Sequence, residues 1–177
     1  MWQTMFLVPK GKGGYRDIGL VEVMWKVVEA ILNIRITASI TFHDFLRGFW
    51  SGRGTGTATL EAKSLQQLVA LKEELLYIIL LDLHTMYDAL YRSRCLEILE
   101  VYRVLPWASW LLLTYWGRLR MVVKEGGYYG FEFKGNRGVT QGGPLSPTIF
   151  NVVVDVVVRH WFTFMVESVE ERSGHGQ

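Results

Sequence analysis

A short apolar run that ends in an acid constrains the fold more than any other part of this sequence. Four branched residues, Ile78 to Leu81, directly precede Asp82. Such a run is typical of a strand buried on both faces, so we expect a strand at residues 77 to 83. An ionised carboxylate there is costly unless a salt bridge, a helix cap or a divalent metal meets it. Mg²⁺ would suit its hard oxygen ligands, but this stretch alone leaves a structural role equally open.

The first third of the chain predicts a hairpin and a helix. Residues 5 to 20 predict a strand, a turn at Gly13-Gly14 and a second strand around Tyr15 to Ile18. From Leu20 onwards, apolar residues recur at spacings of four and three opposite a polar face, which indicates an amphipathic helix. The apolar face would hold Leu20, Met24, Val27, Ile31 and Ile34, and the polar face Glu22, Lys26, Glu29 and Asn33.

The rest of the chain predicts four more helices and a second hairpin. The last helix would begin at Ser146 and Pro147, with Ser as cap and Pro in the first turn, and would run to about residue 165. Its many β-branched residues favour strands, but a run this long without a breaker exceeds a typical strand. The polar tail after it would be mobile. The other expected elements are a helix carrying Leu65, Leu68, Leu71 and Leu75, a helix from about Ala89 capped by Asp88 with Cys95, Leu99 and Tyr102 on one face, a buried helix from Trp107 to Gly117, and a hairpin turning at Gly126-Gly127.

Composition and charge narrow the classes of function. Half of the residues are apolar and 14% are aromatic, which provides for a large core. The net charge is +2, but residues 1 to 53 hold seven Lys/Arg against four Asp/Glu, and residues 118 to 140 hold five against two. These segments are either solvated faces or a groove for phosphates. Cys95 is the single cysteine, so an internal disulfide and a cysteine zinc site are excluded. Neither a signal peptide nor a membrane span is evident, and we expect an intracellular protein.

Two further stretches could bind a ligand. Lys10, Lys12 and Arg16 gather at the tip of the first hairpin, where Lys offers a point charge and Arg a bidentate fork to phosphates. Exposed lysines are also common on hairpins. Residues 137 to 147 read RGVTQGGPLSP, and two glycines beside an amide allow the backbone to approach a ligand closely.

In this order, the motifs resemble reverse transcriptases, most closely those of bacteria, group II introns and non-LTR retroelements. VPKGKGGYRDIGLVEVMWKVVEAILNIRI resembles the fingers hairpin and first helix, GFWSGRGTGTA the template-side loop, IILLDLHTMYDALYR the catalytic strand, and RGVTQGGPLSPTIFN the QGxPLSP motif. The resemblance implies an α+β fold, a partial right-hand polymerase whose thumb is absent. Fingers would comprise residues 1 to about 74 and 91 to 145, and palm about 75 to 90 and 146 to 177.

The resemblance also implies a role for each matching residue. Asp82 would bind two catalytic Mg²⁺ (or Mn²⁺) ions, one of them also held by the carbonyl of Leu83. Tyr87 would stand where a ribose 2′-OH would have to fit. Lys10, Lys12 and Arg16 would bind the triphosphate, Gln141 and Gly142 the nucleotide sugar and its surroundings, and Arg53, Gly143 and Pro144 the nucleic acid. The implied partners are an RNA template, a DNA primer and deoxynucleoside triphosphates. Oligomeric state stays undetermined.

The sequence also departs from the family. Positions where the family usually has Ala, Lys, Arg and an acid hold Met86, Thr85, Trp50 and Gly143. The family's Ala-Asp-Asp motif is missing, and the 177 residues contain no Asp-Asp pair. Asp155 lies on the preceding helix and is a poor substitute. Three readings therefore stand: a polymerase fragment that is inactive by itself, a catalytically dead remnant, and an unrelated nucleic-acid-binding module.

Overall fold

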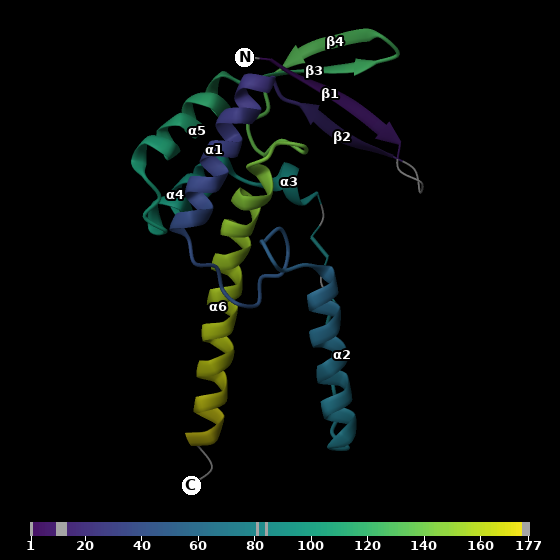
Figure 1. Cartoon of the computed structure of the whole chain (residues 1–177), viewed down its shortest axis with the longest axis vertical. Coiled ribbons are helices and arrows are strands. Elements are labelled where there is room, and N and C mark those ends of the chain that lie inside the picture. Colours follow the sequence, from purple (N-terminus) through teal and green to yellow (C-terminus); the bar gives the residue numbers. More distant parts are fainter. Residues whose placement is uncertain (1, 10–13, 81, 84, 175–177) are drawn as a thin grey trace.

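The computed structural model describes residues 2–9, 14–80, 82–83 and 85–174. Within these ranges, the chain forms a four-stranded sheet and six helices. The sheet extends to one side of a group of packed helices, and the long last helix points away from it (Figure 1). The expected mixture of helices and strands is confirmed.

The sheet is built from two hairpins joined by one parallel pair. Strands β1 (Trp2–Pro9) and β2 (Tyr15–Leu20) are antiparallel, as are β3 (Arg120–Glu125) and β4 (Tyr128–Phe133). β1 also pairs in parallel with β3, which gives the order β2-β1-β3-β4. Gly126 and Gly127 have φ angles of +56° and +88°, the left-handed backbone that a tight hairpin turn requires. Both predicted hairpins are confirmed.

The core lies among the helices. Helix α1 (Val23–Ser39), α4 (Arg92–Val101), α5 (Pro106–Arg118) and the first turns of α6 (Ser146–Gly174) contribute its side chains. Leu32, Leu99, Leu112 and Ile149, one from each helix, are almost fully buried. The predicted helix at Trp107 to Gly117 is confirmed, but it is buried on one face only: Leu112 is 1% exposed, whereas Trp110 is 65% exposed. Cys95 and Leu99, predicted to share a face, are both buried in α4.

The predicted buried face of α1 is wrong. Met24, on the expected apolar face, is 77% exposed, whereas Glu29, expected to face solvent, is 4% exposed. The buried side chains are Trp25, Glu29, Leu32 and Ile36. Trp25 stacks on Tyr115 of α5, with ring centroids 3.9 Å apart. Burying two large aromatic rings outweighs the aliphatic stripe, so the helix turns its Trp25 face inwards.

The predicted strand at residues 77 to 83 is not formed. Residues 74–80, 82 and 83 have no regular structure, and Leu80 is 91% exposed. A strand needs a neighbour for its backbone N–H and C=O groups, and none of the four described strands pairs with this segment. The preceding helix α2 (Thr55–Leu71) stands apart from the core (Figure 1), and none of its described side chains is buried.

Two helix boundaries differ from the expectation. Asp88 lies in the short helix α3 (Met86–Ala89), and α4 begins later, at Arg92, with Tyr91 before it, so Asp88 does not cap that helix. Helix α6 begins at Ser146 as predicted but continues to Gly174, through the tail that we expected to be mobile. Residues Ser146–Glu167 are long and apolar enough to cross a membrane. Core helices meet the same criterion, and the first turns of α6 are part of the core.

Asp155 joins three parts of the helical core. Its side chain is fully buried in α6. One carboxylate oxygen accepts a hydrogen bond from the backbone N–H of His43 at 2.6 Å, and the other from Arg159 Nε at 2.7 Å and from the hydroxyl of Tyr102. Asp155 therefore fixes the loop after α1 and the end of α4 to α6, and its position is structural.

Candidate functional site

The loop of residues 135 to 145 is bonded to the segment that follows Asp82. The backbone N–H of Gly138 donates to the carbonyl of Leu90 at 2.7 Å, and that of Val139 donates to the carbonyl of Tyr87 at 2.9 Å. Arg92 adds two hydrogen bonds from its guanidinium to the carbonyls of Gly135 (2.6 Å) and Gly138 (2.8 Å). Two segments separated by about fifty residues are thus held side by side, mainly through backbone atoms.

The same loop is bonded to the sheet on its other side. The backbone N–H of Gly19 in β2 donates to the carbonyl of Gln141 at 2.9 Å. Gly142 has a φ angle of +104°, and a Cβ there would lie 3.2 Å from the carbonyl oxygen of Gly19. Only glycine fits this backbone without strain. The residues Gln141 and Gly142 are therefore fixed between β2 and the helix α3 region.

A groove of about 370 Å³ opens along this loop. The predicted residues Tyr87, Gln141, Gly142, Gly143 and Pro144 all line it. Tyr87 is half-buried, and its ring centroid lies 5.7 Å from that of Phe150. Burial raises the pKa of its hydroxyl above the ordinary value, so the phenol stays neutral at physiological pH. An aromatic wall facing an amide and exposed backbone is the kind of lining that small-molecule sites use. Further lining residues are Phe49, Thr140, Ser146 and Pro147.

Asp82 and Leu83 are not among the residues that line this groove. Both are exposed and lie in the irregular segment before α3. Within the described residues, no group of three or more His, Cys, Asp or Glu side chains is placed to hold a metal. A carboxylate with a neighbouring carbonyl still fits one side of a Mg²⁺ site, because this ion often takes one or two protein oxygens and completes its shell with phosphates and water.

The basic candidates have different positions. Lys10 and Lys12 lie outside the described residues, and Arg16 lies on β2 opposite Val8. Arg53 forms an ion pair with Asp44 at 2.8 Å and also donates to the carbonyl of Leu46 at 3.3 Å. The hydrogen bond from Arg53 to the Asp44 carboxylate, and then the charge of Arg53, hold the pKa of Asp44 below its usual range. In this structure, Arg53 fixes the loop that carries Phe49.

The sequence reasoning missed two contributors to the site. Phe49 lines the groove from a glycine-rich loop without periodicity, and its φ angle of +50° is not foreseeable from residue type. Glu29 lies behind the loop: a Cβ at Gly143 would come within 2.6 Å of its Oε2. The helical pattern had placed Glu29 on the solvent face. The sequence did hold one signal: Glu29 lies four residues after Trp25 and three before Leu32, so it shares a helical face with two large apolar residues.

The comparisons with known proteins agree with the motifs. Residues 8–170 match the family described as reverse transcriptase (RNA-dependent DNA polymerase), so the chain belongs to this family. The predicted resemblance is confirmed. One relative is the retrovirus-related Pol polyprotein from the type-2 retrotransposable element R2DM of Drosophila melanogaster, 28% identical over 146 residues. The Pol polyprotein from the type-1 retrotransposable element R2 of Nasonia vitripennis is 28% identical over 163 residues.

These alignments cover most of the chain but little of the relatives. They include 82% and 86% of this chain, and 14% and 15% of the respective polyproteins. The chain is therefore similar to a reverse transcriptase segment of non-LTR retroelement Pol proteins.

Proposed function

We propose that this chain is part of an RNA-directed DNA polymerase and that the groove beside Tyr87 receives the incoming deoxynucleotide. One observation carries the proposal. Tyr87 and Gln141 to Pro144, each chosen from sequence for a role at the nucleotide or the nucleic acid, line one groove although two segments far apart in the chain supply them. Backbone hydrogen bonds hold the two segments together.

In this proposal, Tyr87 selects the sugar by exclusion. Its half-buried ring packs near Phe150 and has limited freedom to move aside. A ribose 2′-OH would meet the ring, whereas a deoxyribose would not, so specificity arises from a clash with the wrong substrate. Gln141 would lie beside the sugar, and the bare backbone of Gly142 would allow close approach.

Asp82 would be the metal-binding residue, with the carbonyl of Leu83 beside it. Bound Mg²⁺ or Mn²⁺ would supply charge stabilisation for the attacking 3′ oxygen and the departing pyrophosphate. Lys10, Lys12 and Arg16 would bind the triphosphate, and Arg53, Gly143 and Pro144 the nucleic acid. The partial right-hand architecture, with fingers at about 1–74 and 91–145 and palm at about 75–90 and 146–177, belongs to the same proposal, as does an intracellular location.

We propose further that the isolated chain turns over slowly. Its 177 residues contain no Asp-Asp pair, and a metal site whose residues act as a unit loses most of its rate when one part is missing. In this proposal, binding of an RNA template, a DNA primer and a deoxynucleotide rests on the groove and on the basic side chains. A catalytically dead remnant is the second candidate, favoured by the same missing pair.

Nucleotide selection provides the test. Binding of dATP and ATP to the chain with an RNA template, a DNA primer and Mg²⁺ should favour dATP, and Tyr87→Ala should reduce this preference by about tenfold or more. Tyr91→Ala is the matched control, because Tyr91 is exposed and does not line the groove. An unchanged preference in Tyr87→Ala, or an equal loss in Tyr91→Ala, contradicts the assignment. Primer extension by the parent chain, abolished in Asp82→Ala and retained in Glu74→Ala, would rule out the remnant.

A further inference from the structure

A buried acid lies directly behind the groove. Glu29 of α1 is 4% exposed. Its Oε1 accepts a hydrogen bond from Trp25 Nε1 at 2.9 Å, whereas its Oε2 has no hydrogen-bond partner among the described residues. The described residues also offer it no salt bridge. A buried carboxylate oxygen without a hydrogen-bond partner lowers the stability of the fold, so the presence of Glu29 here needs an explanation.

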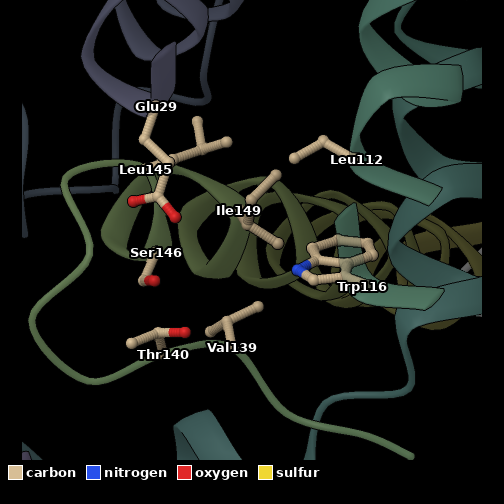
Figure 2. A pocket seen from close by; sticks show the side chains of 8 residues that line it. All are labelled: Glu29, Leu112, Trp116, Val139, Thr140, Leu145, Ser146 and Ile149. Atoms are coloured by element: carbon tan, nitrogen blue, oxygen red, sulfur yellow. The ribbon is translucent and has the colours of Figure 1, made fainter. Parts of the chain in front are cut away.

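The loop separates Glu29 from the groove as a thin wall. A cavity of about 10 Å³ lies on the inner side, and Thr140 and Ser146 line both this cavity and the outer groove. Figure 2 shows the carboxylate of Glu29 pointing towards the Ser146 hydroxyl, with Thr140 beyond it and Leu112, Ile149 and Trp116 on the apolar side. The cavity has room for one water molecule, and it offers the oxygen partners that such a water needs.

Direct contact joins Glu29 to the loop backbone at Gly143. A Cβ on Gly143 would lie 2.6 Å from Glu29 Oε2 and 3.0 Å from Ser146 Oγ. The turn has few strong bonds of its own: Gly143 N–H donates to Thr140 at 3.2 Å and Ser146 N–H donates to Gly143 at 3.3 Å. These distances are at the long end for N–H···O bonds. The start of the turn is held from the sheet, because Gly19 N–H donates to the carbonyl of Gln141 at 2.9 Å and the Thr140 hydroxyl donates to Gln3 Oε1 at 3.2 Å. The part that depends on support from behind is therefore Gly143 to Ser146.

We propose that Glu29 is a positioning residue for the groove: its carboxyl packs against Gly143 and, through one buried water, holds the hydroxyls of Thr140 and Ser146. This inference rests on the proposed nucleotide groove for its functional meaning. Loss of the carboxyl would release the turn from Gly143 to Ser146 and widen the groove at this side.

Electrostatics around Glu29 agree with this role. Burial raises the pKa of Glu29 above its ordinary value, and the hydrogen bond from Trp25, the nearby backbone N–H of Leu145 and the charge of Lys26 oppose the rise. Burial, and then the charge of Glu29, raise the pKa of the Tyr115 hydroxyl. Functional sites are enriched in buried carboxyls whose pKa is shifted in this way beside a groove.

Amide hydrogen exchange of the chain tests the contact itself. In Glu29→Ala, the amides of Gly143 and Ser146 should exchange about tenfold faster or more, beyond the change expected from lost global stability. Leu32→Ala is the matched control, since it removes core contacts one turn further along α1 without touching the cavity. Glu29→Gln keeps the shape and a polar group at Oε2, so protection should return. Equal exchange at these amides in Glu29→Ala and Leu32→Ala, after correction for stability, overturns the proposal.

A double-mutant cycle and dATP binding test the same contact independently. Gly143→Ala should destabilise the parent chain and cost less in a Glu29→Ala background, because the clash with Oε2 is then gone; purely additive effects would contradict the contact. Glu29→Ala should also weaken dATP binding several-fold while Leu32→Ala does not. If the parent chain binds no dATP, the proposed function fails, and the exchange data still decide the role of Glu29.

Discussion

Replacement of Asp155 by alanine should destabilise the helical core more than any surface substitution. The carboxylate is fully buried and receives hydrogen bonds from His43, Tyr102 and Arg159. After the change, the partly buried amide of His43 and hydroxyl of Tyr102 lose a charged acceptor, which costs about 1.5–3 kcal/mol each. The side chain of Arg159 is 46% exposed, so water can solvate it and its loss adds little.

The expected total for Asp155→Ala is about 3–4 kcal/mol, because relaxation offsets part of the two losses. For a chain of this size, it corresponds to a fall in Tm of about 6–16 °C. Asp155→Asn keeps the volume and one acceptor oxygen, so about half of the loss should remain.

Thermal unfolding followed by circular dichroism measures the effect. Glu97→Ala is the control: this acid also pairs with an arginine, Arg94 at 2.6 Å, but on the exposed surface of α4, and should leave Tm unchanged within error. Tyr102→Phe should couple to Asp155→Ala in a double-mutant cycle. A Tm loss in Asp155→Ala no larger than in Glu97→Ala would refute the structural role of this residue.

Three other outcomes follow from buried groups. The thiol of Cys95, whose pKa burial raises to about 11, should react with a disulfide reagent at neutral pH only as fast as the chain unfolds; rapid reaction of the folded chain would contradict its burial. Arg92→Lys keeps the charge but cannot bridge the carbonyls of Gly135 and Gly138, so we expect a loss of about 1–2 kcal/mol in urea unfolding and faster exchange at Gly138. The pKa of Glu29 is raised in the folded chain above 4.5. The protonated carboxyl therefore contributes fully to the free energy of unfolding below pH 4.5, and this contribution is lost as pH rises through the folded pKa. Urea midpoints should therefore fall over that window in the parent and stay flatter in Glu29→Gln.

Local signals were sufficient for the hairpins and for most helix positions. Gly126-Gly127 marks a tight turn by backbone chemistry alone, and Ser146-Pro147 marks a helix start in the same way. The groove was partly foreseeable too, because Tyr87 and Gln141 belong to motifs whose order identifies the family. That these two residues line one groove depends on hydrogen bonds between distant segments, and no local pattern reports those.

Three wrong predictions have a common physical cause, which is that burial depends on a packing or bonding partner. The apolar stripes of α1 through Met24 and through Trp25 are both helical, and the stack on Tyr115 decides between them. Residues 77 to 80 have the composition of a buried strand, but the described sheet gives them no neighbour. Glu29 was assigned to solvent by its charge, although the neighbouring indole of Trp25 supplies the hydrogen bond that makes its burial possible.

The backbone hydrogen bonds between Tyr87 and Val139 and between Leu90 and Gly138 limit which amino-acid changes can alter the groove. They depend on peptide groups, which every residue except proline carries in full. Side chains on the two walls can therefore change over generations without loss of these bonds, except at Gly138 and Gly142, whose backbone requires glycine. Proline at Gly138 or Val139 would remove one of these bonds. Any side chain at Gly138, whose φ angle is +84°, would also press on the backbone of Asp88, because its Cβ would lie 3.0 Å from the Asp88 Cα.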